Sequence, residues 1–171
     1  VADFLRSGAF LGMKRKTAPF AAILLLAFGQ SVLAQSAVET ALAGTVTIEV
    51  AGPDGQAHGS GFVVSSDGII VTAAHVIEGV TSATVRFQDG EEFSVEGVIA
   101  VDGSKDFALL RIAGFDLPTV PLGNSDEVLI AQRVIAIGAP VDAAFSGTVS
   151  DGLVSAERLV DGTKIIQISV P

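Results

Sequence analysis

Short apolar runs recur along most of this chain, and turn-forming residues separate them. The runs are rich in Val, Ile, Phe and Thr, which favour half-buried, pleated strands. Pairs such as Asp67-Gly68 and Asp161-Gly162 stand between the runs, as expected for tight turns. The pattern predicts strands at Thr45–Val50, Gly61–Val64, Ile69–Thr72, Ala83–Phe87, Phe93–Ala100, Phe107–Ile112, Arg133–Ile137, Gly147–Ser155 and Lys164–Val170.

Helical periodicity is almost absent after Gln35. The exception is a short candidate helix, Ser36–Ala43, in what we expect to be the mature N-terminal segment, residues 35–43. Short strands at near-regular spacing are typical of a sandwich or a barrel, so the sequence predicts an all-β fold. Prolines in residues 114–125 predict a linker between two lobes, because proline is excluded from central strands.

The N-terminal residues have the character of a targeting segment. A basic start, an apolar run and small residues at a cleavage position follow one another: Met13-Lys14-Arg15-Lys16, Ala18 to Phe28 and Val32-Leu33-Ala34. This order predicts a cleaved signal peptide over residues 13–34, with residues 1–12 as an upstream extension. A membrane anchor is the alternative, but the apolar run is short for a spanning helix. We expect an exported protein, periplasmic or secreted, with no stable membrane insertion after cleavage.

Charge and composition narrow the possible partners. The 171 residues carry a formal net charge of −9 at pH 7, and a nucleic-acid partner is not expected because phosphates need a basic surface. The chain has no cysteine and 2 histidines, His58 and His75, which are too few ligands for a typical zinc site. We therefore expect no cofactor and no metal, and we interpret His58 as an exposed loop residue.

His75 and Asp106 are the residues best suited to chemistry. His75 follows a short apolar run and two alanines, and a histidine held at a strand end is suited to act as a general base. On its own, such a histidine is more often a packing or capping residue. Asp106 precedes the run Phe107–Ile112 and could orient an imidazole, although an ordinary turn role is the alternative. Asp102 is the rival acid, but its surroundings are those of a turn.

Several segments together resemble the trypsin-like serine proteases, and within them the cysteine-free bacterial HtrA/Deg-type branch. They occur in the family's order: Gly59-Ser60-Gly61-Phe62, Ile70–Val76, Asp106–Ile112, Leu122–Asp126, Val134–Pro140 and Gly147–Ser155. The resemblance implies two antiparallel six-stranded barrels with the active site between them. Residues 44–113 would form a complete first barrel and residues 126–171 a truncated second barrel. The general base would be His75 and the orienting acid Asp106.

The nucleophilic serine is where this chain departs from the family. The resemblance places the family's Gly-Asn-Ser-Gly-Gly-Pro-like motif beyond Pro171. Ser125 is followed by Asp126-Glu127 in place of two glycines, so it lacks the backbone freedom of an oxyanion loop. Ser60 suits a turn close to the backbone, and Ser169 lies in a predicted strand. We expect no nucleophile within this chain.

The resemblance implies a serine endopeptidase that cleaves polypeptides in periplasmic quality control. We expect this chain by itself to be inactive, because the nucleophile is missing. HtrA-type proteins often form trimers, so the full-length protein is a candidate homo-oligomer. Two alternatives stay open. One is a non-catalytic β-barrel binding or regulatory module derived from a protease. The other is a barrel without protease ancestry, in which His75 and Asp106 would lie far apart.

Overall fold

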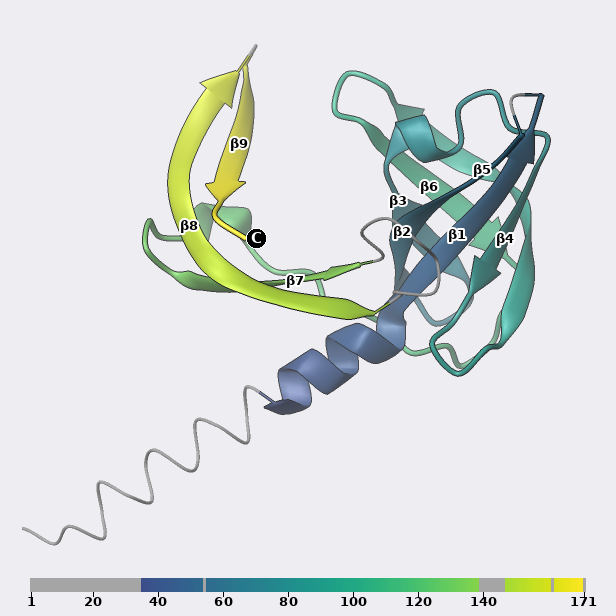
Figure 1. Ribbon diagram of the computed structural model, residues 1–171, viewed down its shortest axis with the longest axis horizontal. Helices are drawn as coiled ribbons and strands as arrows, with labels where there is room; N and C mark the ends of the chain where they lie inside the picture. Colours follow the sequence, from purple (N-terminus) through teal and green to yellow (C-terminus); the bar gives the residue numbers. More distant parts are fainter. Residues whose placement is uncertain (1–34, 54, 139–146, 161, 171) are drawn as a thin grey trace, which may run out of the picture. The chain divides into compact units, whose positions relative to one another are not determined.

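The computed structural model describes residues 35–53, 55–138, 147–160 and 162–170, which form a closed barrel, a smaller sheet and one short helix (Figure 1). The helix covers residues 35–44. The strands are β1 (Thr45–Gly52), β2 (Gly55–Ser65), β3 (Ile69–Thr72), β4 (Ser82–Arg86), β5 (Glu92–Asp102), β6 (Phe107–Ile112), β7 (Arg133–Gly138), β8 (Thr148–Val160) and β9 (Thr163–Ile168). Two short 3₁₀ segments, η1 (Ala74–Val76) and η2 (Ser125–Glu127), lie between strands.

The barrel consists of β1 to β6, and each neighbouring pair is antiparallel. The strand order is β1-β2-β3-β6-β5-β4, and β4 pairs back onto β1 with Ile48 opposite Val85. This last pairing leaves the barrel without an open edge. The prediction of an all-β fold with a complete first barrel is confirmed.

Alternating side chains fill the barrel interior. Along β1, the apolar residues two apart, Val46, Ile48 and Val50, are all buried, as the period of a strand requires. The core cluster is completed by residues of β2, β3, β4 and β6, by the residue after β4 and by one from the loop after β6: Val63, Ile70, Val85, Phe87, Leu110, Ile112 and Leu117. Burial of this apolar surface is the main force that holds the barrel closed.

The turn between β2 and β3 is fixed against the end of β6. Gly68 has a φ of 100°, and a Cβ atom on it would collide with the carbonyl oxygen of Ile112. The Ile112 amide donates a hydrogen bond of 3.0 Å to the Gly68 carbonyl. Glycine supplies both the left-handed conformation and the space. This contact holds β3 and β6 side by side, which matters for the candidate site.

The second sheet is a partial structure made of β7, β8 and β9. The strands pair antiparallel in that order, for example Ile135 with Asp151 and Glu157 with Ile166. Large apolar side chains on this sheet remain exposed, among them Leu159 at 76% and Ile135 at 45%. A partial sheet of this kind agrees with the predicted incomplete second barrel. The boundaries assigned to the individual segments remain predictions.

Several strands extend beyond the ranges that the sequence pattern indicated, and β2 and β8 extend the furthest. β2 begins at Gly55 and not at Gly61, and β8 continues to Val160. The added part of β2 is poor in strand-forming residues, but it pairs with β1, with His58 opposite Glu49. Pairing with a neighbouring strand has overridden weak local propensity. The interpretation of His58 as a loop residue was therefore wrong.

The predicted signal peptide and upstream extension, residues 1–34, lie outside the described residues. Among the residues that are described, no helix has the length and apolar character needed to cross a membrane.

Candidate active site

The pairing of β3 with β6 brings His75 and Asp106 together. Thr72, the last residue of β3, lies opposite Ala108 near the start of β6. Because the strands are antiparallel, the chain just after β3 and the chain just before β6 are at the same end of the barrel. His75 follows β3 within η1, and Asp106 immediately precedes β6. Two residues 31 positions apart in the sequence thereby become neighbours.

A close contact with β2 holds η1 in place. The amides of Val76 and Ile77 donate to the carbonyls of Ala73 and Ala74, at 3.2 and 3.1 Å, and close the short turn. The side chain of Val76 lies over Gly59, where a Cβ atom would be only 2.5 Å from Val76 Cγ2. Because glycine has no side chain, Gly59 allows η1 to pack closely against β2. Sequence reasoning noted the glycines of this segment, but not this contact.

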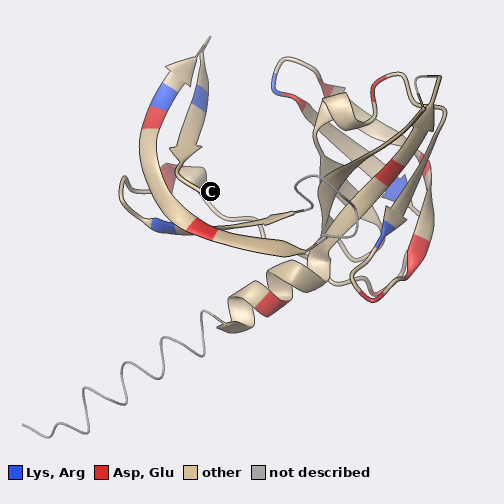
Figure 2. Cartoon of the chain, in the orientation of Figure 1, with Lys and Arg blue, Asp and Glu red and all other residues tan. Residues whose placement is uncertain are grey.

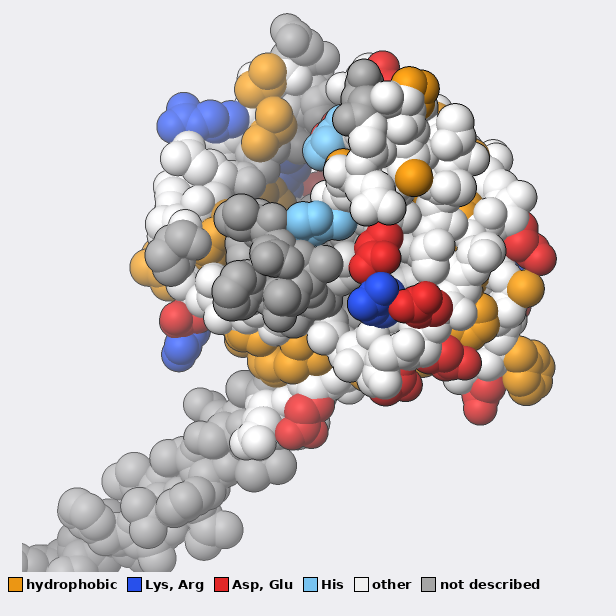
Figure 3. Space-filling view, turned by 45° about the vertical axis from the view of Figure 1, so that its right-hand side comes forward, with side chains coloured by type: hydrophobic (Ala, Val, Ile, Leu, Met, Phe, Trp, Pro, Cys, Tyr) orange, Lys and Arg blue, Asp and Glu red, His pale blue; other side chains and the backbone are white. Residues whose placement is uncertain are grey.

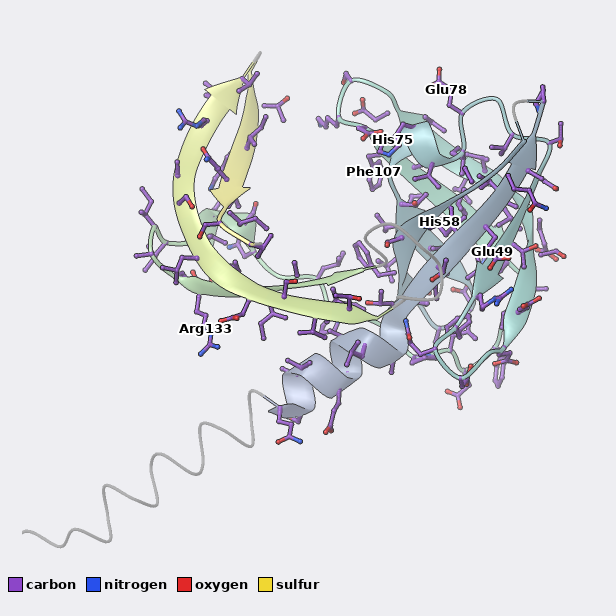
Figure 4. The ribbon with its side chains drawn as sticks, viewed as in Figure 1. Glu49, His58, His75, Glu78, Phe107 and Arg133 are labelled. Carbon is purple, nitrogen blue, oxygen red and sulfur yellow. The ribbon has the colours of Figure 1, made fainter. Side chains whose placement is uncertain are left out.

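The carboxylate of Asp106 binds His75 at two points. Its Oδ2 atom lies 2.6 Å from Nδ1 of the imidazole, and its Oδ1 accepts a 2.9 Å hydrogen bond from the His75 backbone amide. Figure 4 shows His75 on the turn at this end of the barrel, with Phe107 beside it. A carboxylate held by both the ring and the backbone fixes the orientation of the ring as well as its position.

The same contacts set the electrostatics of the pair. The hydrogen bond from the His75 backbone amide, followed by that from the His75 side chain, holds the pKa of Asp106 below its usual range. Asp106 is therefore an anion at neutral pH, and its Oδ2 atom accepts a hydrogen bond from the protonated Nδ1 of His75. The His75 and Asp106 side chains are 69% and 51% exposed, so solvent screens the electrostatic interaction between them.

This arrangement can perform proton transfer through the free side of the imidazole. With Nδ1 bonded to Asp106, Nε2 is the ring atom that can accept a proton from another group. Histidine side chains reach the surface on the face shown in Figure 3, where a basic side chain also lies between acidic ones. In β4, Arg86 forms ion pairs with Glu49 and Glu92, at 3.0 and 2.9 Å.

The rival acid, Asp102, is not bonded to His75. Its carboxylate accepts hydrogen bonds from Ser104 and Lys105 within the turn between β5 and β6. The turn role that the sequence indicated for Asp102 agrees with these contacts.

The three serines considered as nucleophiles lie in other settings. Ser125 begins η2, after an Asn124 side chain that caps the turn, and its carbonyl accepts a bond from Lys164 at 2.8 Å. The hydroxyl of Ser169 lies close to the backbone of Leu153. Ser60 is part of strand β2, and its carbonyl accepts a 2.9 Å bond from the Thr72 hydroxyl.

Acidic and basic residues are distributed over the barrel strands and the second sheet, as the coloured cartoon in Figure 2 shows. Within the described part of the chain, no group of 3 or more His, Cys, Asp or Glu side chains is placed to hold a metal ion.

Comparison with known proteins decides the family. Residues 59–171 match the trypsin-like peptidase domain. The chain belongs to the trypsin-like peptidase family. The matched residues include His75, Asp106 and the whole second sheet, so a barrel without protease ancestry is ruled out.

Curated relatives place the chain in the DegP/HtrA branch of this family. A probable periplasmic serine endoprotease, DegP-like, from Pseudomonas savastanoi pv. phaseolicola is 43% identical over 102 residues, which are 60% of this chain and 21% of the relative. A protein of the same description from Hahella chejuensis is 41% identical over 104 residues, 61% of this chain and 22% of the relative. The chain thus spans about a fifth of the length of these relatives.

Solved structures of the same branch share the fold. The HtrA-type protease AlgW, solved with a tripeptide, has a TM-score of 0.66 at 29% identity, covering 71% of this chain and 39% of AlgW. The serine endoprotease from Yersinia pestis has a TM-score of 0.65 at 30% identity, covering 71% of this chain and 44% of that protein. The predicted resemblance to the HtrA-type trypsin-like proteases is confirmed.

Proposed function

We propose that the protein acts as a serine endopeptidase in which His75 is the general base and Asp106 orients it. The observation that carries this proposal is the double contact of the Asp106 carboxylate with the ring and the backbone amide of His75. Membership of a family whose relatives are described as serine endoproteases supports the same reaction class.

In this reaction, Nε2 of His75 takes the proton of a serine hydroxyl as the serine attacks a peptide carbonyl. The imidazolium then returns the proton to the leaving amine. Asp106 keeps the proton on Nδ1 and stabilises the positive charge that forms on the ring. Because the pKa of Asp106 is held low, its carboxylate remains ionised while His75 gains and loses its proton.

The nucleophilic serine is proposed to come from sequence beyond Pro171. In the family motif, the nucleophilic serine follows Gly-Asn and precedes two glycines. No serine in the 171 residues has these neighbours on both sides. The 171-residue chain alone is then without peptidase activity. Loss of a triad nucleophile lowers turnover by roughly 10⁶-fold in a well-studied protease of this mechanism.

The substrates are proposed to be unfolded or damaged polypeptides in the periplasm. The signal peptide of residues 13–34 would direct export of the protease to that compartment. The relatives named above are described as periplasmic, which supports this location. Assembly of the full-length protein into a homo-oligomer remains part of the proposal.

A fluorophosphonate probe, which reacts with activated serines, tests the proposal. The gene is expressed to the codon for Pro171 and, separately, through to the next in-frame stop codon. We expect labelling of the longer product alone, and we expect Asp106→Asn to slow its cleavage of unfolded casein by about 10⁴-fold. Labelling of the 171-residue chain, or full activity of Asp106→Asn, would contradict the proposal.

A further inference from the structure

The turn that connects β5 to β6 is organised around one side chain, that of Asp102. Its Oδ1 atom accepts hydrogen bonds from the Ser104 backbone amide at 3.1 Å, from the Ser104 hydroxyl at 2.6 Å and from the Lys105 amide at 3.3 Å. The Lys105 amide also lies 3.3 Å from the Asp102 carbonyl. Asp102 Oδ1 is therefore hydrogen-bonded to both Ser104 and Lys105, the two residues between Gly103 and Asp106.

The next residue, Asp106, has an uncommon backbone conformation. Its φ is 52°, in the left-handed region that residues with a Cβ atom seldom adopt. Such a conformation persists only where the surrounding structure imposes it. On the C-terminal side, β6 is fixed by its pairing with β3. On the N-terminal side, the chain is restrained by the turn held by Asp102 and by the pairing of Asp102 with Phe107 across the β5–β6 hairpin.

The side chain of Asp106 is held from outside its own hairpin. Among the described residues, its carboxylate accepts hydrogen bonds from Ala74 and His75, which belong to η1. The backbone of the β5–β6 turn sets the position from which the Asp106 side chain extends, and the bonds from η1 then hold its carboxylate. A change of that backbone would move the carboxylate relative to both the ring and the amide of His75.

We propose that Asp102 is a positioning residue for the His75–Asp106 pair, because its carboxylate fixes the turn that presents Asp106 to the imidazole. The catalytic consequence rests on the function proposed above, whereas the geometric role does not depend on it. Asp102 Oδ1 acts as a hydrogen-bond acceptor here. The negative charge of Asp102 contributes less to holding the turn. Its ion pair with Lys105 is long, with 3.8 Å between Nζ and Oδ2, and both side chains are 40% or more exposed to solvent.

Three substitutions of Asp102 separate acceptor geometry from charge. Asp102→Asn keeps an oxygen in the same place without the charge. Asp102→Glu keeps the charge but carries it one methylene further from the turn. Asp102→Ala removes both. The matched control is Asp89→Ala in the β4–β5 turn, where Asp89 Oδ1 similarly accepts a 3.0 Å bond from the Glu91 amide.

The test uses NMR on the whole chain and needs no peptidase activity, so it can fail independently of the proposed function. It follows the low-field signal of the proton between His75 Nδ1 and Asp106, together with titration of the Asp106 carboxyl. In Asp102→Asn and Asp89→Ala, we expect the signal to persist and the pKa of Asp106 to stay lowered. In Asp102→Glu and Asp102→Ala, we expect the signal to be lost and the pKa of Asp106 to rise toward its ordinary value.

A persistent signal in Asp102→Glu would overturn the proposal, as would equal loss of the signal in Asp89→Ala or in Asp102→Asn. If Asp102→Ala does not fold, the comparison between the Asn and Glu variants decides the question.

Discussion

The contact between Gly59 and Val76 gives the sharpest structural prediction for the site. A Cβ atom on Gly59 would lie 2.5 Å from Val76 Cγ2 and 2.7 Å from Val76 Cγ1. Both distances are too short for carbon atoms in contact, so Gly59→Ala must displace the Val76 side chain and disturb the packing of η1 on β2. Because η1 carries His75, the substitution is expected to weaken the contact with Asp106 as well as the packing of the barrel.

The expected cost follows from overpacking. Forcing an extra methyl group into a filled site costs typically about 1–3 kcal/mol of the free energy of unfolding. The same substitution at an unobstructed glycine stabilises a protein by about 0.4–1 kcal/mol, because the unfolded chain loses freedom. Gly97 in β5 is such a position, since a Cβ atom there would meet nothing within 4 Å.

Chemical denaturation of the variants measures the difference. We expect Gly59→Ala to lose about 1–3 kcal/mol while Gly97→Ala is neutral or slightly stabilised. Adding Val76→Ala removes both clashing atoms and leaves Cβ of residue 76 at 3.2 Å, so the double variant should recover most of the loss relative to Val76→Ala alone. The His75–Asp106 proton signal should weaken in Gly59→Ala only.

Equal unfolding free energies for Gly59→Ala and Gly97→Ala would refute this reasoning. Strict additivity of Gly59→Ala and Val76→Ala would also contradict it, because the predicted loss comes from contact between these two side chains.

Two further predictions concern the stability of the barrel and its pH dependence. Ile48 is fully buried whereas Ile99 is 49% exposed, so Ile48→Ala should cost about 2–5 kcal/mol in denaturant titration and Ile99→Ala about 0.5 kcal/mol or less. Equal losses would contradict the assigned core. Hydrogen bonds from Ser65 and then Arg111 hold the pKa of Asp67 below its usual range. A lowered folded-state pKa adds stability above the ordinary carboxyl pKa, and this stability is lost as the pH falls through the lower folded value. Asp67→Asn should therefore reduce the acid-induced loss of stability, and an unchanged pH profile would contradict this.

The strands of the barrel could be predicted from the sequence because their residue types alternate and their turns carry Gly and Asp. The first half of β2 could not, because Ala57, His58 and Gly59 have weak strand preference and are held there by pairing with β1. Closure of the barrel through β1 and β4 also depends on contacts between distant residues. No local pattern encodes them.

The candidate site was predictable in part. The sequence singled out His75 and Asp106, with Asp102 as a rival acid in a turn-like setting, and the resemblance to a family implied their roles. The pairing of β3 with β6 places Asp106 next to the imidazole. The left-handed φ of Asp106 and the bond from the His75 amide had no sequence signal, since both depend on how the β5–β6 turn meets η1.

The most direct test of the central claim compares the two histidines of the chain. In the product of the gene continued past Pro171, the kcat/KM for an unfolded polypeptide is measured with His75→Ala and with His58→Ala. His58 lies in β2 opposite Glu49, whereas His75 is the histidine that contacts Asp106, so His58 is the matched control. The account predicts loss of about 10⁴-fold or more for His75→Ala and an unchanged rate for His58→Ala. Activity retained in His75→Ala, or equal losses in both variants, would contradict it.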